Sequence, residues 1–295
     1  MLTTLSSATS AFLEIDMSIP FSPTKFTILG GKGFIGSHLI RRLKDEGHQV
    51  FAPDKITPDV LKTKHGHLIY SIGLTSDFRN RTLDTIQAHV CILRDLLEHA
   101  EFESLTYLSS TRVYHGSDST NEYASLRVNP DNAEDLYNIS KIAGESLCVH
   151  SGRPNVKIAR LSNIVGYRKD SDLFIDQLLH EIMANKALTL KSSLFSEKDY
   201  LYIDDAVNAI LFLATSTTTG CVNVASGNNI SNLTIIEHLK VIFDFDLIIS
   251  DNAPLIDFMP IDISRIKNLF PYEPAQFTEF FPKFINFYKY FKGSN

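Results

Sequence analysis

Short runs of apolar, β-prone residues alternate along the chain with longer segments whose apolar residues recur at helical spacing. The short runs predict strands at 25–29, 49–52, 67–72, 104–109 and 156–161. The longer segments predict helices at 34–46, 83–100 and 134–150. Strands that alternate with helices build parallel βαβ units, so this pattern predicts an α/β fold with a doubly wound parallel sheet.

The regularity weakens after about residue 168. The pattern there predicts helices at 172–187, 204–214 and 234–243, separated by short strand-like runs. Aromatic residues in 277–291 also recur at helical spacing, which favours a closing helix packed on this part of the chain over a helix on a membrane or partner. We therefore expect a smaller lobe at the carboxyl edge of the sheet, where open α/β folds bind ligands.

Composition narrows the class of protein. The 295 residues are 44% hydrophobic and 21% charged, with a formal net charge of −6, which suits one large or two unequal globular domains. No Lys/Arg run suggests a nucleic-acid partner, and no apolar run reaches the roughly 18 residues of a membrane span. The segment 1–21 lacks a basic secretion signal and is expected to be a disordered tail.

The cysteines indicate a reducing compartment. Cys91, Cys148 and Cys221 are far apart, odd in number and form no CxxC pair. We therefore expect reduced thiols in a cytoplasmic protein, and no metal site.

The stretch FTILGGKGFIGSHL joins the first predicted strand to the first predicted helix. Gly30 permits a sharp turn, Gly33 lets a pyrophosphate approach the backbone, and Gly36 lets the helix pack on the strand. Phe34 and Ile35 begin the helix, whose free N–H groups favour an anion. Glycine-rich turns also occur without a ligand, so these five candidate contacts need support from elsewhere.

That support comes first from the second predicted strand. Asp54 follows this strand, 18 residues after Gly36, where a carboxylate can accept hydrogen bonds from an adenosine ribose. Lys32, inside the loop, is a cation that could meet a 2′-phosphate, as could Lys55. Because Asp54 would repel that phosphate, the pattern favours NAD and leaves NADP open.

A second constellation lies on the fourth strand and the helix after it. Tyr137 and Lys141 are four residues apart, which places them on one helix face. A lysine ammonium favours phenolate, so we expect a lowered pKa for Tyr137, which would suit acid–base chemistry on a hydroxyl or carbonyl. Ser110 ends the preceding strand and could hydrogen-bond the same oxygen. With the glycine loop, these residues predict a reaction beside a dinucleotide.

Six stretches, in the correct order, resemble motifs of the extended short-chain dehydrogenase/reductase superfamily and its NAD-dependent epimerase/dehydratase family. GGKGFIGSHL resembles the glycine loop, SSTRVYH the SSxxVYG strand end, and YNISKIAGE the YxxSKxxGE helix. ARLSNIVG resembles the RxxNxxG segment, KDYLYIDDAVNAI the RDFxHVDDxxxAI segment, and VNVASG the YNxxxG segment. The resemblance spans about residues 25–275; it is specific for fold and cofactor class and much less so for the substrate.

The resemblance implies a division of the chain and of its assembly. It implies a dinucleotide-binding Rossmann domain at 22–167, to which 199–224 returns, and a mainly substrate-binding lobe at 168–295. The helices at 83–100 and 134–150 resemble those that form a four-helix dimer interface in this superfamily, so we expect a homodimer.

The resemblance also implies roles for single residues. Tyr137 takes the position of the catalytic acid/base, Lys141 that of the residue which holds the nicotinamide ribose and lowers the tyrosine pKa, and Ser110 that of the catalytic Ser/Thr. Asn163 would face a substrate, often a nucleotide-sugar diphosphate in this family. Lys198 stands where the family often has a diphosphate-binding arginine.

Two departures from the family pattern change the expectations. Thr111 and Arg112 follow Ser110, where dehydratases carry Asp-Glu, so a 4,6-dehydratase is not expected and we assign both residues to substrate binding. Only 12 residues separate Asp54 from His67, too few for the family's usual strand–helix unit. We predict a sheet that is one strand smaller at one edge and an adenine pocket that is more open.

A third departure lies after the third predicted strand, where YSIGLTSDF replaces the usual HLAA. Gly73 keeps the close approach to the cofactor, while Thr75 and Asp77 add polar groups for the substrate. His89 replaces a common Asn on the following helix. A packed or solvated histidine is one interpretation, and contact with the cofactor is the other.

The motifs together predict an NAD(P)-dependent epimerase or oxidoreductase acting on a sugar nucleotide or related sugar, with Tyr137 moving the proton. A ketoreductase of a non-sugar carbonyl stays open, because Met259 and Pro260 precede Asp262 where the family often has an arginine. A non-catalytic dinucleotide-sensing protein on the same fold is the third reading, although a sensor does not need a tuned phenol. The sequence does not separate epimerase from reductase.

Overall fold

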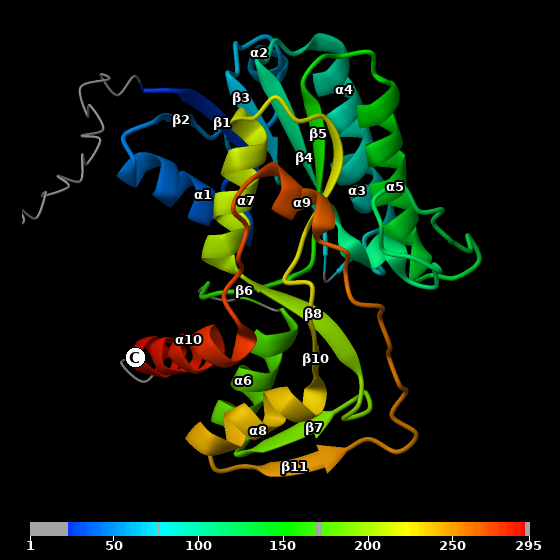
Figure 1. The fold of residues 1–295 in the computed structure, drawn as a ribbon, viewed down its shortest axis with the longest axis vertical. Helices are drawn as coiled ribbons and strands as arrows, with labels where there is room; N and C mark the ends of the chain where they lie inside the picture. The colour runs from blue at the N-terminus through cyan, green and yellow to red at the C-terminus, as the bar shows by residue number, and fades with distance from the viewer. Residues whose placement is uncertain (1–22, 76, 169–170, 172, 293–295) are drawn as a thin grey trace, which may run out of the picture.

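The computed structural model describes residues 23–75, 77–168, 171 and 173–292, so the predicted tail at 1–21 lies outside the described residues. Six strands form one sheet in the order β2-β1-β3-β4-β5-β9, and every neighbouring pair is parallel (Figure 1). These strands are β1 (Lys25–Leu29), β2 (Gln49–Phe51), β3 (His67–Tyr70), β4 (Ser104–Ser110), β5 (Val156–Leu161) and β9 (Gly220–Val224). The predicted parallel α/β sheet is confirmed.

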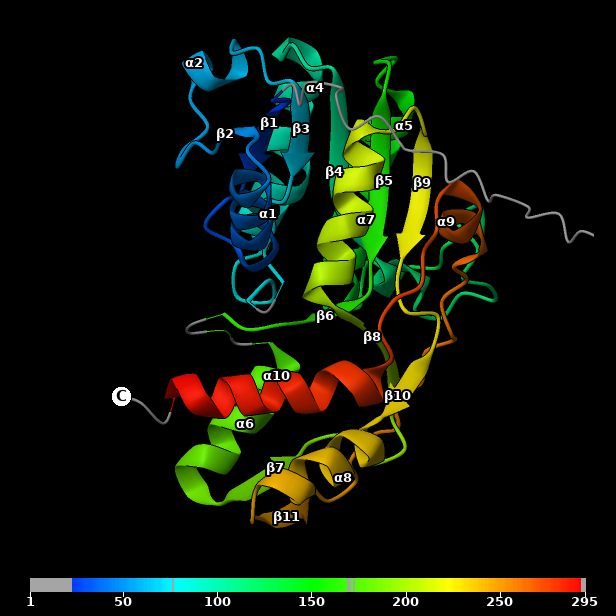
Figure 2. The ribbon, with the colours of Figure 1, turned by 60° about the vertical axis from the view of Figure 1, so that its left-hand side comes forward.

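Helices cover both faces of this sheet (Figure 2). One face carries α1 (Phe34–Asp45) and α7 (Ile203–Thr215), and the other carries α4 (Ile92–His99) and α5 (Asp135–His150). Successive strand residues point to opposite faces, so Leu108 packs in the first core and its neighbour Tyr107 in the second. A strand buried on both faces reads as a continuous apolar run, which is why the pattern of the sequence located these strands.

The segment between Asp54 and His67 contains one short helix, α2 (Pro58–Leu61), and no strand, as its length predicts. Thr57 begins this helix and its side chain accepts a hydrogen bond from the Val60 backbone. As a result, β2 is the last strand at that edge of the sheet in the described part of the chain.

The helix predicted at 83–100 is divided into three parts. These are α3 (Thr82–Ile86), the π-helical turn η1 (Gln87–Cys91) and α4 (Ile92–His99). A π-turn widens the helix by one residue per turn and is frequent at functional sites. Here the widened turn carries His89 into the interior, where its side chain is fully buried.

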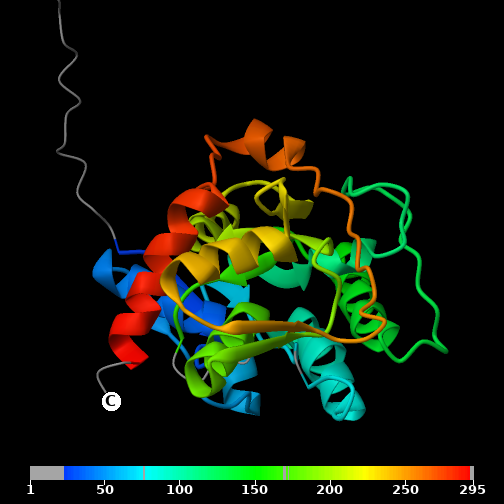
Figure 3. The same cartoon turned by 90° about the horizontal axis from the view of Figure 1, so that it is seen from below.

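A smaller lobe lies beyond the carboxyl edge of the sheet (Figure 1). It contains β6 (Asn163–Val165), β7 (Ala187–Leu190), β8 (Glu197–Tyr202), β10 (Asn229–Ser231), β11 (Asp246–Ile249), α6 (Phe174–Asn185), α8 (Asn232–Ile242) and α10 (Phe277–Lys292). The strands pair in two small sheets, β10-β8-β6 and β11-β7. Seen from below, α10 in red lies beside α8 in yellow (Figure 3). Among its aromatic residues, Phe277, Phe281 and Tyr288 are buried, so the closing helix packs on this lobe as expected.

Two short helices complete the larger part. η2 (Thr111–Tyr114) follows β4 directly, and α9 (Ser264–Leu269) returns from the lobe to pack on β9. No helix among the described residues is both long and apolar enough to cross a bilayer.

Candidate active site

The glycine loop lies at the point where the strand order reverses, between β1 and β3. Gly30 has a φ of 85°, and a Cβ placed on it would be 2.8 Å from the Ser71 backbone beyond β3. A Cβ on Gly36 would be 2.4 Å from the Gly30 carbonyl oxygen, so the close helix packing predicted for this glycine is what the structure has. Gly33 begins α1 without a side chain that could cap it, which leaves the first N–H groups of the helix available to an anion.

Ser110, Tyr137 and Lys141 meet at the carboxyl end of β4. Ser110 ends this strand, and its hydroxyl accepts a hydrogen bond from the Arg112 backbone at 3.2 Å. Tyr137 and Lys141 project from one face of α5 and are only 6% and 4% exposed. The Lys141 ammonium donates to the Leu108 carbonyl at 2.9 Å. The three side chains predicted to act together line one cavity.

The electrostatics of this group differ from the expectation. Burial raises the pKa of Tyr137, and a hydrogen bond with Ser110 and the charge of Arg112 only partly oppose this effect. Burial also lowers the pKa of Lys141 to about 7. The predicted lowering of the Tyr137 pKa by Lys141 is therefore wrong for the protein alone: four-residue spacing gives a shared face, and burial decides the pKa.

His89 lies behind this group and does not line the cavity. Its Nε2 accepts a hydrogen bond from the Leu74 backbone at 3.2 Å, so the ring proton is on Nδ1, which contacts the Ser140 hydroxyl at 2.8 Å. Ser140 in turn donates to the Tyr137 carbonyl at 2.8 Å. Burial, assisted by the charge of Lys141, lowers the pKa of His89 to about 2, so the ring is neutral. This chain of contacts connects the loop after β3 to α5.

A cavity of about 540 Å³ lies between the carboxyl edge of the sheet and the smaller lobe. The predicted site residues that line it are Gly33, Phe34, Ile35, Gly73, Thr75, Ser110, Arg112, Tyr137, Lys141, Asn163 and Lys198. The predicted residues that do not line it are Gly30, Lys32, Gly36, Asp54, Asp77, His89 and Thr111. Gly30 and Gly36 contact each other closely within the glycine loop. Lys32 of this loop forms an ion pair with Asp54.

Asp77 and Thr111 are the two predicted substrate-binding residues that do not line the cavity. Asp77 organises its own turn, accepting hydrogen bonds from the Asn80 side chain and backbone. Thr111 is buried in η2. Each is close in sequence to residues that line the cavity, Thr75 for Asp77 and Ser110 for Thr111, which explains the expectation.

The substrate side of the cavity carries cations. Lys198, on β8, lies 5.3 Å from the centre of the Phe174 ring, and burial together with the charge of Arg112 lowers its pKa. Its ammonium has no hydrogen-bond or ion-pair partner among the described residues. Asn163, on β6, donates to the Asp199 carbonyl at 2.8 Å, which fixes its side chain at the rim.

Sequence reasoning missed three parts of the cavity wall. Arg79 comes from the turn after β3, which belongs to no motif. Arg168 lies at the rim and donates to the Lys32 carbonyl at 3.3 Å; its position two residues after the ARLSNIVG segment was the available signal. Ser171 donates to Asp176 at 2.6 Å on the lobe side, in a stretch without a recognisable pattern.

Two charged motif residues that do not line the cavity, Glu145 and Arg160, serve the fold. Glu145 and Arg160 form a buried ion pair at 2.6 Å, and Ser109 donates to the same carboxylate. Arg160 also donates to the Tyr114 hydroxyl, which donates to Asn223 at 2.8 Å. This network connects α5, β4, β5 and β9 behind Ser110, Tyr137 and Lys141.

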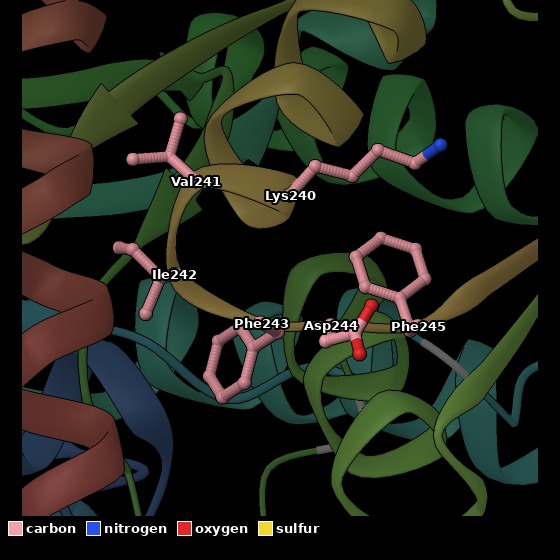
Figure 4. Close-up of a pocket in the computed structure, with 6 residues that line it drawn as sticks. All are labelled: Lys240, Val241, Ile242, Phe243, Asp244 and Phe245. Atoms are coloured by element: carbon pink, nitrogen blue, oxygen red, sulfur yellow. The ribbon is translucent and has the colours of Figure 1, made fainter.

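A second cavity, of about 430 Å³, is lined by the six consecutive residues 240–245 at the end of α8 (Figure 4). The Lys240 ammonium lies 6.0 Å from the centre of the Phe245 ring across it. None of the predicted site residues is present, and we assign no chemistry to it.

Comparison with known proteins agrees with the fold and the motifs. A family model described as the NAD dependent epimerase/dehydratase family matches residues 26–81 and 58–225. The chain belongs to this family. The predicted enzyme class and the predicted nicotinamide dinucleotide are thereby confirmed, since the family is NAD-dependent by its description.

The relatives resemble the chain along most of its length. The UDP-glucuronic acid decarboxylase 6 of Arabidopsis thaliana is 23% identical and covers 86% of this chain and 85% of its own. A UDP-N-acetylglucosamine 4-epimerase from Methanobrevibacter ruminantium has the same fold with a TM-score of 0.73 at 19% identity, covering 90% of this chain and 96% of its own. MoeE5, solved with UDP-glucuronic acid and NAD, has a TM-score of 0.72 at 19% identity, with coverages of 85% and 94%.

Proposed function

We propose that this family member is an NAD-dependent epimerase or oxidoreductase that acts on a hydroxyl-bearing carbon of a sugar nucleotide. The observation that carries the proposal is the convergence of Ser110, Tyr137 and Lys141 on one cavity that Lys198 also lines, a cation without an ion-pair partner among the described residues. The sugar nucleotides handled by the relatives support the same substrate class.

The residues of the loop and the sheet edge fit a nicotinamide dinucleotide. The uncapped N-terminus of α1 at Gly33 suits the pyrophosphate, and Phe34 and Ile35 continue that wall. Gly73 keeps open a surface that a Cβ would fill, 3.1 Å from His89 Nε2 and 3.5 Å from Lys141 Nζ. Bound there, NAD would supply the acceptor for a hydride from the substrate carbon.

The side chains then divide the remaining work. Tyr137 removes the hydroxyl proton, or returns one to a carbonyl, and Ser110 hydrogen-bonds the same substrate oxygen. Lys141, anchored on the Leu108 carbonyl, keeps two further N–H donors for the nicotinamide ribose. His89 acts as a positioning residue, because it fixes α5 against the loop after β3 without reaching the cavity.

We place the substrate along the lobe side of the cavity. Lys198 would neutralise the diphosphate, Asn163 would meet the substrate at the rim, and Thr75 and Arg112 would contact the sugar. Asp77 and Thr111 are left out of this set. The absence of a carboxylate at Thr111 and Arg112 supports epimerase or oxidoreductase chemistry over 4,6-dehydration.

Mass spectrometry of the purified protein tests both ligands at once. We expect NAD in the native complex, and binding of a sugar nucleotide only when NAD is present. Return of the reduced cofactor to NAD without release indicates an epimerase, whereas release of it indicates a dissociable reductase. Binding of NAD with conversion of a non-sugar carbonyl alone would contradict the sugar assignment.

We also propose a homodimer formed through α4 and α5. These helices contact each other on one outer face of the sheet, and Leu83 and Val149 near them are 83% and 60% exposed. Light scattering should give twice the chain mass, and Val149→Asp should give the monomer. The free cysteines 91, 148 and 221 are consistent with the proposed cytoplasmic location.

A further inference from the structure

Two arginines share one carboxylate on the wall of the cavity. Arg79, after β3, and Arg112, in η2, both pair with Glu134, which lies just before α5. The Arg112 contact measures 2.8 Å between Nη2 and a Glu134 carboxylate oxygen, and the same nitrogen contacts the Glu134 carbonyl at 3.3 Å. We call these three residues the arginine cluster. Two positive charges against one negative charge leave the cluster with one net positive charge.

Aromatic rings hold the cluster against the catalytic tyrosine. The Arg79 guanidinium lies 4.5 Å from the centre of the Phe78 ring. The Arg112 guanidinium lies 5.2 Å from the centre of that ring and 5.6 Å from the centre of the Tyr137 ring. Phe78 is fully buried, so the stacking fixes the plane of Arg112 beside the phenol instead of leaving the side chain free in solvent.

Arg112 retains unused donors at this place. Glu134 occupies its Nη2, and no described residue accepts a hydrogen bond from its Nε or Nη1. Arg79 and Glu134 are about half exposed, but Arg112 lines the cavity with its side chain 31% exposed. The hydrogen bonds from Arg79 and Arg112 lower the pKa of Glu134, so this carboxylate stays ionised at neutral pH. The cluster therefore keeps one net positive charge.

A second cation faces the cluster across the same cavity. Arg112 and Lys198 line the same cavity, and burial together with the charge of Arg112 lowers the pKa of Lys198. Two like charges near each other in a partly desolvated wall are unfavourable until anions arrive. The diphosphate of the substrate would neutralise Lys198 on the lobe side. The net positive charge of the arginine cluster, beside Tyr137, would still lack an anion at the end of the cavity where the sugar carbon reacts.

We propose that Arg112, held by Glu134 and stacked on Phe78, binds a carboxylate carried by the sugar ring, so that the substrate is a sugar nucleotide of the uronic acid class. The inference rests on the proposed function and narrows it. The free Nε and Nη1 of Arg112 can each donate a hydrogen bond to a carboxylate oxygen, and the net positive charge of the cluster favours an anion at this place. A neutral hydroxymethyl group at the same ring position would leave that charge unmatched.

The diphosphate of the substrate is the other anion that could bind Arg112. The two sources differ in what they predict for matched ligands. A carboxylate site discriminates an acidic sugar nucleotide from its neutral counterpart, whereas a diphosphate site binds both alike. Titration calorimetry of the NAD-loaded protein can therefore use two matched pairs: UDP-glucuronic acid against UDP-glucose, and GDP-mannuronic acid against GDP-mannose.

We expect the acidic member of at least one pair to bind about tenfold more tightly or better. Arg112→Gln should remove most of this ratio, because it weakens binding of the acidic member much more than binding of the neutral member. Arg112→Lys should restore part of the ratio, since it keeps the charge and loses the planar fork. Lys198→Gln should weaken both members equally, because it acts on the diphosphate.

Three results would overturn the inference. The wild-type protein could bind the neutral members as tightly as the acidic ones, a comparison that needs no variant to fold. Arg112→Gln could weaken both members equally, which would assign Arg112 to the diphosphate or to folding. Binding of neither pair in the presence of bound NAD would instead remove the proposed function, and with it this inference.

Discussion

Lys32 Nζ lies 2.9 Å from Asp54 Oδ2, so the cation inside the glycine loop pairs with the carboxylate that follows β2. These are the two residues that favour opposite cofactors, since Asp54 repels a 2′-phosphate and Lys32 attracts one. Both side chains are largely exposed, at 80% for Lys32 and 67% for Asp54. The pairing partly cancels each charge at the place where the adenosine ribose of NAD is expected.

The first prediction follows from this cancellation. Lys32→Ala leaves the Asp54 charge uncompensated, so the preference for NAD over NADP should rise by about threefold at low salt and fade at high salt. Asp54→Ala should shift the ratio in the opposite direction. Titration of both dinucleotides measures the ratio, and Lys44→Ala, on the exposed last turn of α1, is the matched control. A ratio that ignores both substitutions would remove the ion pair from cofactor selection.

The second prediction concerns the phenol. Tyr137→Phe keeps the buried ring and removes the group that moves the proton, so turnover should fall by about 100- to 10,000-fold. The dissociation constant of NAD should stay within about threefold, because Lys141 and the glycine loop are unchanged. Tyr123→Phe, at a tyrosine that is 79% exposed, serves as control. Unchanged biological activity in Tyr137→Phe would favour the dinucleotide-sensing alternative.

The strands and the glycine loop could be predicted because local signals determine them. A strand buried on both faces has a continuous apolar run, and a turn that packs on Gly36 needs glycine within a few residues. The short segment before His67 likewise has too few residues for another strand and helix. These properties depend on neighbouring residues alone, so one sequence suffices to find them.

The remainder depends on contacts between distant residues. Arg79 meets Glu134 across 55 positions, and no periodicity connects them. The π-turn at His89 changes the hydrogen-bond register without interrupting the apolar spacing, so a continuous helix was expected. The prediction of a lowered Tyr137 pKa was wrong because the four-residue spacing shows only that Tyr137 and Lys141 share a helix face. The pKa depends on how deeply the tertiary fold buries that face.

The third prediction tests the titration of Lys141. Its pKa is about 7 in the folded protein and near the ordinary value of 10.5 when unfolded, so between these values the unfolded chain binds more protons. The free energy of unfolding should therefore rise with pH from about 7 to about 10, and Lys141→Met should remove this rise. At pH 7, without dinucleotide, the free energy of unfolding of the variant should be higher by on the order of 4 kcal/mol, measured by urea denaturation.

Lys157 provides the matched control for that experiment. Its side chain is also buried, burial lowers its pKa to about 8, and its ammonium donates to the Ala214 carbonyl near the amino end of β5, away from the cavity at the carboxyl edge. Lys157→Met should show the same direction of change in stability while leaving dinucleotide binding intact. Loss of binding in both variants would indicate damage to the fold instead of a role for Lys141.

The fourth prediction concerns the ring of His89. Because its Nε2 accepts from Leu74 and its pKa is lowered to about 2, the ring should stay neutral, with its proton on Nδ1, throughout the range from pH 5 to 8. Nitrogen NMR shifts of the histidines should show one signal that does not titrate and that disappears in His89→Asn. Titration of that signal near pH 6.5 would contradict the buried arrangement.

The fifth prediction separates the motif residues that hold the fold from those that act on ligands. Arg160→Met leaves the Glu145 carboxylate buried with Ser109 as its remaining partner, so unfolding should require about 3 to 5 kcal/mol less free energy. Adding Glu145→Leu removes the stranded charge, and the double variant should recover a large part of that loss. Arg42→Met, which breaks the exposed pair with Glu46, should cost less than about 0.5 kcal/mol.

Urea denaturation of Arg160→Met, of Glu145→Leu and of the double variant gives the coupling energy between the two residues directly. If Arg160→Met lowered the free energy of unfolding as little as Arg42→Met does, water would reach Glu145. The ion pair would then not be a buried contact that stabilises the fold. A large cost with recovery in the double variant would identify the arginine of ARLSNIVG and the glutamate of YNISKIAGE as structural partners. Their presence in motifs would then reflect the need to hold β5 against α5, behind Tyr137, and would carry no information about the substrate.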